Sequence, residues 1–138
     1  MKKSIVRIFA LSLVAIIMCV TLASCATPNA DPAKALAALK DNGYSAEKID
    51  DSGLGAVAIG LLKAAGIEGV KSVVSGTNKD GEHITIFYFE DNASANAEWE
   101  DVQKYADDEK KDSDSEWVVE KSGKMIYFGT KNAVKAAK

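Results

Sequence analysis

Arginine is almost absent from this sequence, which has a single one, Arg7, close to the N-terminus. The guanidinium group is the usual bidentate clamp for carboxylate and phosphate. Its absence from residues 8–138 therefore counts against a site for phosphates or anionic sugars. Histidine is nearly as scarce, because His83 is the only one and a Ser-His-Asp arrangement would have to use it. No G-x-S-x-G motif accompanies it, so we interpret His83 as a half-exposed strand residue and expect no catalytic residues.

Cysteine is confined to Cys19 and Cys25, so no disulfide can form within residues 26–138. The fold must then rest on its apolar core. The sequence also lacks a complete calcium-binding loop. Residues 112–116, Asp-Ser-Asp-Ser-Glu, alternate possible oxygen ligands as such a loop does, but Trp117 occupies the position at which the loop requires glycine. His83 next to Asp80 and Glu82 is a weak alternative, since adjacent strand residues point to opposite faces. We therefore expect no metal and no cofactor.

Residues 53–58 contain a glycine motif that resembles a cofactor-binding pattern. Gly53-Leu-Gly55-Ala-Val-Ala58 matches the G-x-G-x-x-A fingerprint of dinucleotide-binding folds. That fingerprint requires a strong strand before it and usually an acidic residue about 20 positions later, on the tip of a second strand. The preceding residues 44–49 make a poor strand. We interpret the small residues as allowing a helix to lie close to a sheet.

The first 25 residues form the most specific pattern in the chain. Lys2, Lys3 and Arg7 precede an apolar run at residues 8–20 that is shorter than the roughly 20 residues a membrane span needs. Leu22-Ala-Ser-Cys25 follows this run. The segment closely resembles the signal peptide and lipobox of bacterial lipoproteins, whereas the alternative is an uncleaved N-terminal helix.

This resemblance implies a covalent lipid on Cys25, cleavage before it, and recognition of Leu22, Ala23 and Ser24 by the processing enzymes. Residues 1–24 would be a signal peptide, 25–30 a short lipidated tether and 31–138 a single domain. The expected location is the outer face of the cell membrane, or the outer membrane. Several buried acyl chains hold a protein firmly, since each methylene contributes about 0.8 kcal/mol.

The chain left after this cleavage is acidic. Without Lys2, Lys3 and Arg7 it has 14 lysines against 20 acidic residues, a net charge near −6. Nucleic acid and anionic lipid surfaces repel such a protein. We therefore expect no nucleic-acid partner and attachment to the membrane through the lipid alone.

Hydrophobic periodicity and turn residues predict alternating helices and strands. One helix begins at Asp31-Pro32 and another has its apolar face at Leu54, Val57, Ala58, Leu61, Leu62 and Ala65. A third buries Ala95, Trp99, Val102 and Ala106, and a short last helix follows Thr130. The expected strands are 44–49, 70–77, 83–90, 117–121 and 124–129, of which 44–49 could instead be a loop.

The order from residue 44 predicts an α+β fold, with helices on one face of an antiparallel sheet. It matches a ferredoxin-like βαββαβ core with an added hairpin strand and a short helix. If residues 44–49 were a loop, four meandering strands would remain and the ferredoxin-like name would not apply.

Aromatic residues on the expected strands suggest a binding surface. Helices on one face would leave some aromatic side chains on the other face, and exposed apolar patches commonly mark interactions. Tyr88, Trp117 and Tyr127 are the candidates. We therefore expect a non-catalytic, lipid-anchored module that binds another envelope component. An accessory protein that binds solutes or cell-wall fragments is the alternative; an enzyme dependent on His83 and a structural spacer are further hypotheses.

Overall fold

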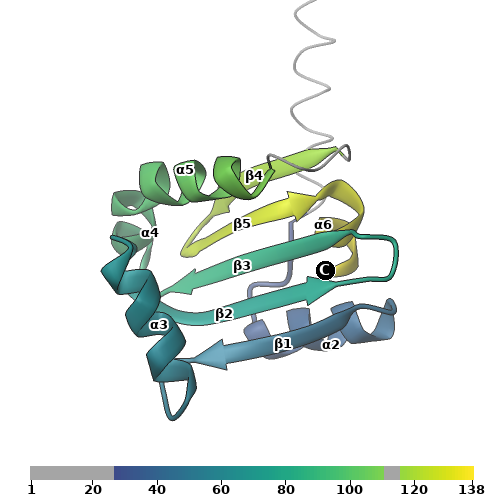
Figure 1. Cartoon of the computed structure of the whole chain (residues 1–138), viewed down its shortest axis with the longest axis horizontal. Helices are drawn as coiled ribbons and strands as arrows, with labels where there is room; N and C mark the ends of the chain where they lie inside the picture. The colour runs from purple at the N-terminus through teal and green to yellow at the C-terminus, as the bar shows by residue number, and fades with distance from the viewer. Residues whose placement is uncertain (1–26, 111–115) are drawn as a thin grey trace, which may run out of the picture.

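The computed structural model describes residues 27–110 and 116–138, and Figure 1 shows their arrangement. Within these two ranges, five strands form one sheet in the order β1-β2-β3-β5-β4, with every neighbouring pair antiparallel. Their bounds are β1 Ser45–Asp50, β2 Val70–Thr77, β3 His83–Phe89, β4 Trp117–Ser122 and β5 Met125–Thr130. Residues 45–50 are thus a strand and not a loop.

Among the described residues, five helices connect or flank these strands: α2 Pro32–Asp41, α3 Gly55–Ala64, α4 Asn92–Ala97, α5 Trp99–Lys110 and α6 Lys131–Ala136. Local chemistry explains two of their beginnings. The Asp31 carboxylate accepts a hydrogen bond from the Ala33 amide at 2.9 Å, with proline at the first helical position. The Asp91 carboxylate likewise accepts from the Ser94 amide at 2.7 Å. The single helix expected around Trp99 is divided into α4 and α5 at Glu98.

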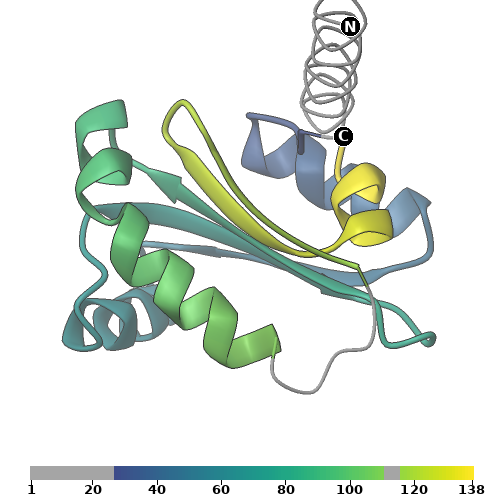
Figure 2. The same cartoon turned by 90° about the horizontal axis from the view of Figure 1, so that it is seen from above.

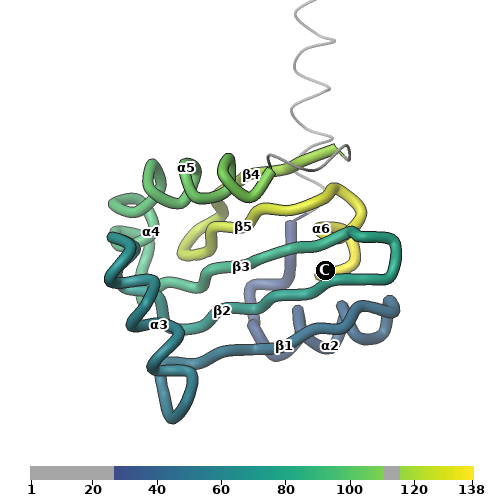
Figure 3. The backbone as a smooth tube through the Cα atoms, in the orientation of Figure 1, coloured from purple at the N-terminus to yellow at the C-terminus, as the bar shows by residue number. Residues whose placement is uncertain are grey.

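The α+β class and the antiparallel sheet are confirmed. Along the chain the elements follow the expected βαββαβ order, with β5 and α6 appended. The ferredoxin-like pairing itself is not confirmed. Consecutive strands β1, β2 and β3 lie side by side as a meander, as the backbone trace in Figure 3 shows.

Helices cover both faces of the sheet, so the expectation of helices on one face is wrong (Figure 2). On one face α2 and α6 pack over Tyr44, Val74, Ile84, Ile86, Tyr88, Met125 and Tyr127. On the other face α3, α4 and α5 pack over Val70, Val73, Phe87, Phe89, Ile126 and Phe128. The strands in the middle of the sheet are therefore apolar on both sides. In β3, for example, the four consecutive residues from Ile86 to Phe89 are all buried.

Candidate functional site

Two of the three aromatic residues expected at a binding surface are buried. Tyr88 is 4% exposed and Tyr127 is 1% exposed, both in the core under α2 and α6. The Tyr88 hydroxyl donates to the Asn29 carbonyl oxygen at 2.8 Å, and the Tyr127 hydroxyl donates to Glu120 Oε2 at 2.7 Å. Burial raises the pKa of both hydroxyls. The prediction that they lie on a free face is wrong, because helices cover the face we expected to be open.

Trp117, the third candidate, is half-buried on the opposite side of the sheet. Its ring lies 4.9 Å from that of His83 and 6.2 Å from that of Phe128, measured between centroids. Its indole Nε1 is buried and has no hydrogen-bond partner within the described residues. The structure thus separates Trp117 from Tyr88 and Tyr127, so the three do not form one surface.

Leu22, Ala23, Ser24 and Cys25 lie outside the described residues, as does the calcium-like stretch up to residue 115. Their roles remain predictions. Within 27–110 and 116–138, no group of three or more His, Cys, Asp and Glu side chains is placed to hold a metal. None of the helices in those ranges has the length and apolarity needed to cross a bilayer.

A polar cluster around Glu82 joins three parts of the fold. Its Oε2 accepts from the Tyr44 hydroxyl at 3.0 Å and from Asn78 Nδ2 at 3.3 Å, while Oε1 accepts from Asn132 Nδ2 at 2.6 Å. Burial, and then the hydrogen bond to Glu82, raise the pKa of Tyr44 to about 12. Both carboxylate oxygens are engaged, so this cluster ties together the residue just before β1, the β2–β3 turn and α6.

The unusual surface of the molecule is the outer side of α3. Large hydrophobic residues exposed within the described ranges are Leu54 at 93%, Val57 at 66%, Leu61 at 68% and Tyr105 at 38%. Three of these four therefore belong to α3 or the residue just before it. The predicted apolar face of this helix is therefore wrong as a buried face at Leu54, Val57 and Leu61. Leu62 of that face does pack against the core, together with Ile59 from outside it.

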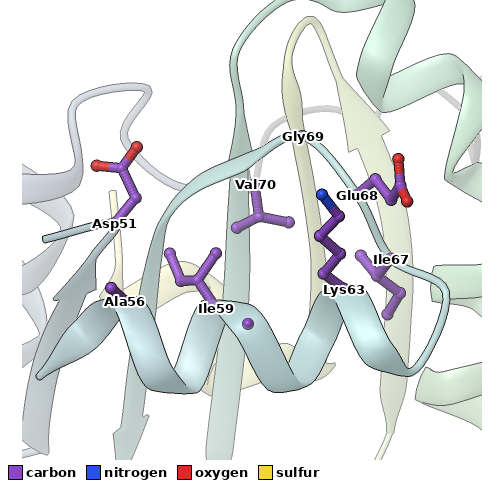
Figure 4. A pocket seen from close by; sticks show the side chains of 9 residues that line it. Asp51, Ala56, Ile59, Lys63, Ile67, Glu68, Gly69 and Val70 are labelled. Atoms are coloured by element: carbon purple, nitrogen blue, oxygen red, sulfur yellow. The ribbon is translucent and has the colours of Figure 1, made fainter.

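The inner side of α3 carries its only charged residue. Lys63 and Ile59 line a cavity of about 280 Å³ between the helix and the chain that leads into β2. Figure 4 shows them on the side of α3 that faces this cavity, with Glu68 beyond Lys63 and Asp51 at the first turn. No residue within α3 is fully buried. The helix thus exposes its large apolar residues on the outer side, while Lys63 is exposed beside the cavity on the other side, unlike an ordinary surface helix with a polar outer face.

The G-x-G-x-x-A motif explains where α3 begins. A Cβ on Gly55 would lie 2.1 Å from the Asp50 carbonyl oxygen, so only glycine permits this approach of the helix to the end of β1. This agrees with our interpretation of the motif as a close-packing device.

Sequence reasoning missed the α3 surface although a signal was present. Ile59 lies off the predicted face, so the helix is apolar nearly all round and periodicity offers two candidate faces. Lys63 lies close to Ile59 in helical angle, about 40° away at 100° per residue. Its side chain is exposed, but on the side of the helix where Ile59 lines the cavity.

No protein family model, curated protein or solved structure matches this chain significantly.

Proposed function

We propose that this chain is a lipid-anchored, extracytoplasmic lipoprotein of the bacterial envelope that works as a non-catalytic binding module. Its binding surface is the outer side of α3, which replaces the surface expected around Tyr88, Trp117 and Tyr127. The observation that carries this proposal is the exposure of Leu54, Val57 and Leu61 side by side on one helix. Contiguous apolar surface of this kind on a soluble domain commonly marks an interaction site.

The first described residues support an orientation for this module. Thr27 hydrogen-bonds Tyr127, and the Asn29 amide donates to the Ala137 carbonyl oxygen at 2.8 Å. The start of the domain is therefore tied to the face covered by α2 and α6. Cys25 lies two residues before Thr27, within about 7 Å of extended chain. A lipid on Cys25 holds that face toward the bilayer, and α3 on the opposite face then points into the aqueous space (Figure 2).

Replacing Cys25 by serine tests the anchor. We expect the wild-type chain in the membrane fraction, with an N-terminal peptide that begins at residue 25 and carries the mass of the lipid. Cys25→Ser removes the sulfur that accepts the lipid, so that lipid mass and processing at residue 25 are both lost. Mass spectrometry of the N-terminal peptide measures each outcome.

Cys19→Ser is the matched control, since it changes a cysteine within the apolar run and leaves the lipobox intact. This variant should be processed and lipidated like the wild type. A wild-type chain that begins at Met1, or one with a free thiol at residue 25, would contradict the proposed anchor.

A second candidate function is binding of a solute or cell-wall fragment, and one hollow favours it. An open cavity of about 820 Å³ lies at the end of the sheet beside the start of the domain, lined by Ala30, Tyr88, residues 90–93 and residues 122–125. Glu90, Asp91 and Lys124 place charges of both signs around it. A rise in melting temperature with muropeptides, reduced by Lys124→Ala, would support this role. An unchanged melting temperature at millimolar ligand would remove it.

A further inference from the structure

We propose that the outer side of α3 binds the same helix of a second copy of this chain, in an antiparallel and two-fold symmetric contact. This proposal deepens the function above, because it depends on the α3 surface being the binding surface and names the partner. The contact between two α3 helices does not depend on the lipid at Cys25, so the proposed dimer and the proposed lipid anchor can fail separately.

The shape of α3 is complementary to itself. At 100° per residue, Leu54, Val57 and Leu61 form a central ridge on the outer side. Small residues flank this ridge on both sides, namely Gly60 and Ala64 on one and Ala58 and Ala65 on the other. A Cβ on Gly60 would meet nothing within 4 Å, so the groove beside the ridge is open. Ridges of one helix that fit into grooves of another are the usual basis of helix pairing, and small residues permit close approach.

Charge does not oppose a second copy at this surface, and the helix dipoles favour the antiparallel direction. The chain cleaved at residue 25 is acidic overall, which makes copies repel, but the residues of the ridge and its flanks carry no ionisable side chain. Antiparallel pairing places the two helix dipoles in opposite directions.

The available area predicts a weak dimer. The three large side chains expose on the order of 400 Å² per copy, which is the size of the largest apolar patch on an ordinary monomer. Two such patches and their flanks bury about 1,000 Å², near the lower limit for a specific interface. Confinement of both copies to one bilayer would raise their effective concentration and so the fraction of dimer, although the contact itself does not require the lipid. A bilayer is a poorer occupant of this surface, because the tether leaves from the opposite face of the sheet.

Variants of the full chain with one added cysteine test the contact in membranes. Val57→Cys and Leu61→Cys each place a thiol on the ridge. A two-fold axis near the ridge would bring that thiol close to the same thiol of the second copy. Mild oxidation should give disulfide-linked dimers of twice the chain mass on a non-reducing gel. Lys79→Cys is the control, because this exposed residue lies in the β2–β3 turn, at the end of the sheet away from α3 (Figure 1). We expect at least about tenfold more dimer from the ridge variants.

Leu61→Glu provides a second measurement that does not need a cysteine. The charge should lower the dimer fraction in native mass spectrometry by about tenfold or more, while the melting temperature of the dilute chain stays unchanged because residue 61 is exposed. The proposal would be overturned if the ridge cysteines crosslinked to a different protein, or if neither ridge position gave crosslinks. It would also be overturned if the wild-type chain bound neutral lipid vesicles and Leu61→Glu did not, because α3 would then bind a bilayer. Dimers that persist in Cys25→Ser would support it even if the lipid anchor failed.

Discussion

Gly129 and Gly60 show how differently one residue type can matter in this chain. Gly129 lies in β5 with φ at +153°, and a Cβ there would lie 2.2 Å from the His83 carbonyl oxygen and 2.7 Å from the Ile84 Cα. The pairing of β3 with β5 therefore requires a residue without a side chain at this position. Gly60 lies in a helix interior, where glycine is unfavourable relative to alanine and where a Cβ meets open space.

Alanine at these two positions should have opposite effects. Gly129→Ala forces the main chains of β3 and β5 apart, and we expect a loss of about 2 kcal/mol or more in the free energy of unfolding. Gly60→Ala should raise it by about 0.5–1 kcal/mol, through lower entropy of the unfolded chain. Urea unfolding at low protein concentration measures both. Equal effects of the two substitutions would contradict the packing of β3 against β5.

At the scale of elements, α3 is the least firmly packed of the helices. None of its residues is fully buried, although nearly all of them are apolar. By contrast, α2 buries Ala35 and Leu39 completely, and α5 buries Val102 and Ala106. Periodicity identified the residues that share one side of α3, but the opposite side was apolar as well. Contacts with the sheet decided the orientation, through Ile59 and Leu62.

Two β-branched residues on different sides of α3, Val57 and Ile59, test that orientation. Ile59→Ala removes a half-buried side chain from the core, and we expect a cost of roughly 1–2 kcal/mol in the free energy of unfolding. Val57→Ala changes an exposed side chain and should stay within about 0.5 kcal/mol of the wild type. Chemical denaturation of the dilute chain distinguishes them. A larger loss for Val57→Ala would mean that α3 faces the sheet with its other side.

For the whole molecule, the core between the sheet and the pair α2 and α6 contains three tyrosine residues, Tyr44, Tyr88 and Tyr127. Burial is the main cause of the raised pKa of Tyr44, Tyr88 and Tyr127. A pKa raised in the folded state favours the neutral hydroxyl there. The corresponding stability is complete below about pH 10, the pKa of tyrosine in the unfolded chain, and it is lost as the pH rises toward the folded value.

The folded chain should therefore lose stability between about pH 10 and pH 12, the value for Tyr44. Urea midpoints across this range measure the loss, and tyrosinate absorbance should rise together with unfolding. Tyr44→Phe removes one titrating hydroxyl and should make the dependence on pH less steep. A midpoint that is constant up to pH 12 would contradict the burial of these hydroxyls.

Local patterns in the sequence were sufficient for the elements and the fold class. Asp31-Pro32, Asp91 and the β-branched and aromatic run from residue 83 locate helix beginnings and a strand, because capping and backbone preference act over a few residues. The lipobox at residue 25 remains a prediction of the same local kind. These signals explain why the expected boundaries agree closely with the observed ones.

Which side of the sheet each helix covers was decided only by the tertiary structure. Periodicity tells which residues point the same way, but it contains no information about what they meet. Tyr88 and Tyr127 became core residues because α2 and α6, which lie at opposite ends of the described chain, meet on one face. Leu54, Val57 and Leu61 became surface because that face of the sheet contacts Ile59 and Leu62 instead. Contacts between distant segments determined both outcomes, and no short stretch of sequence specifies such contacts.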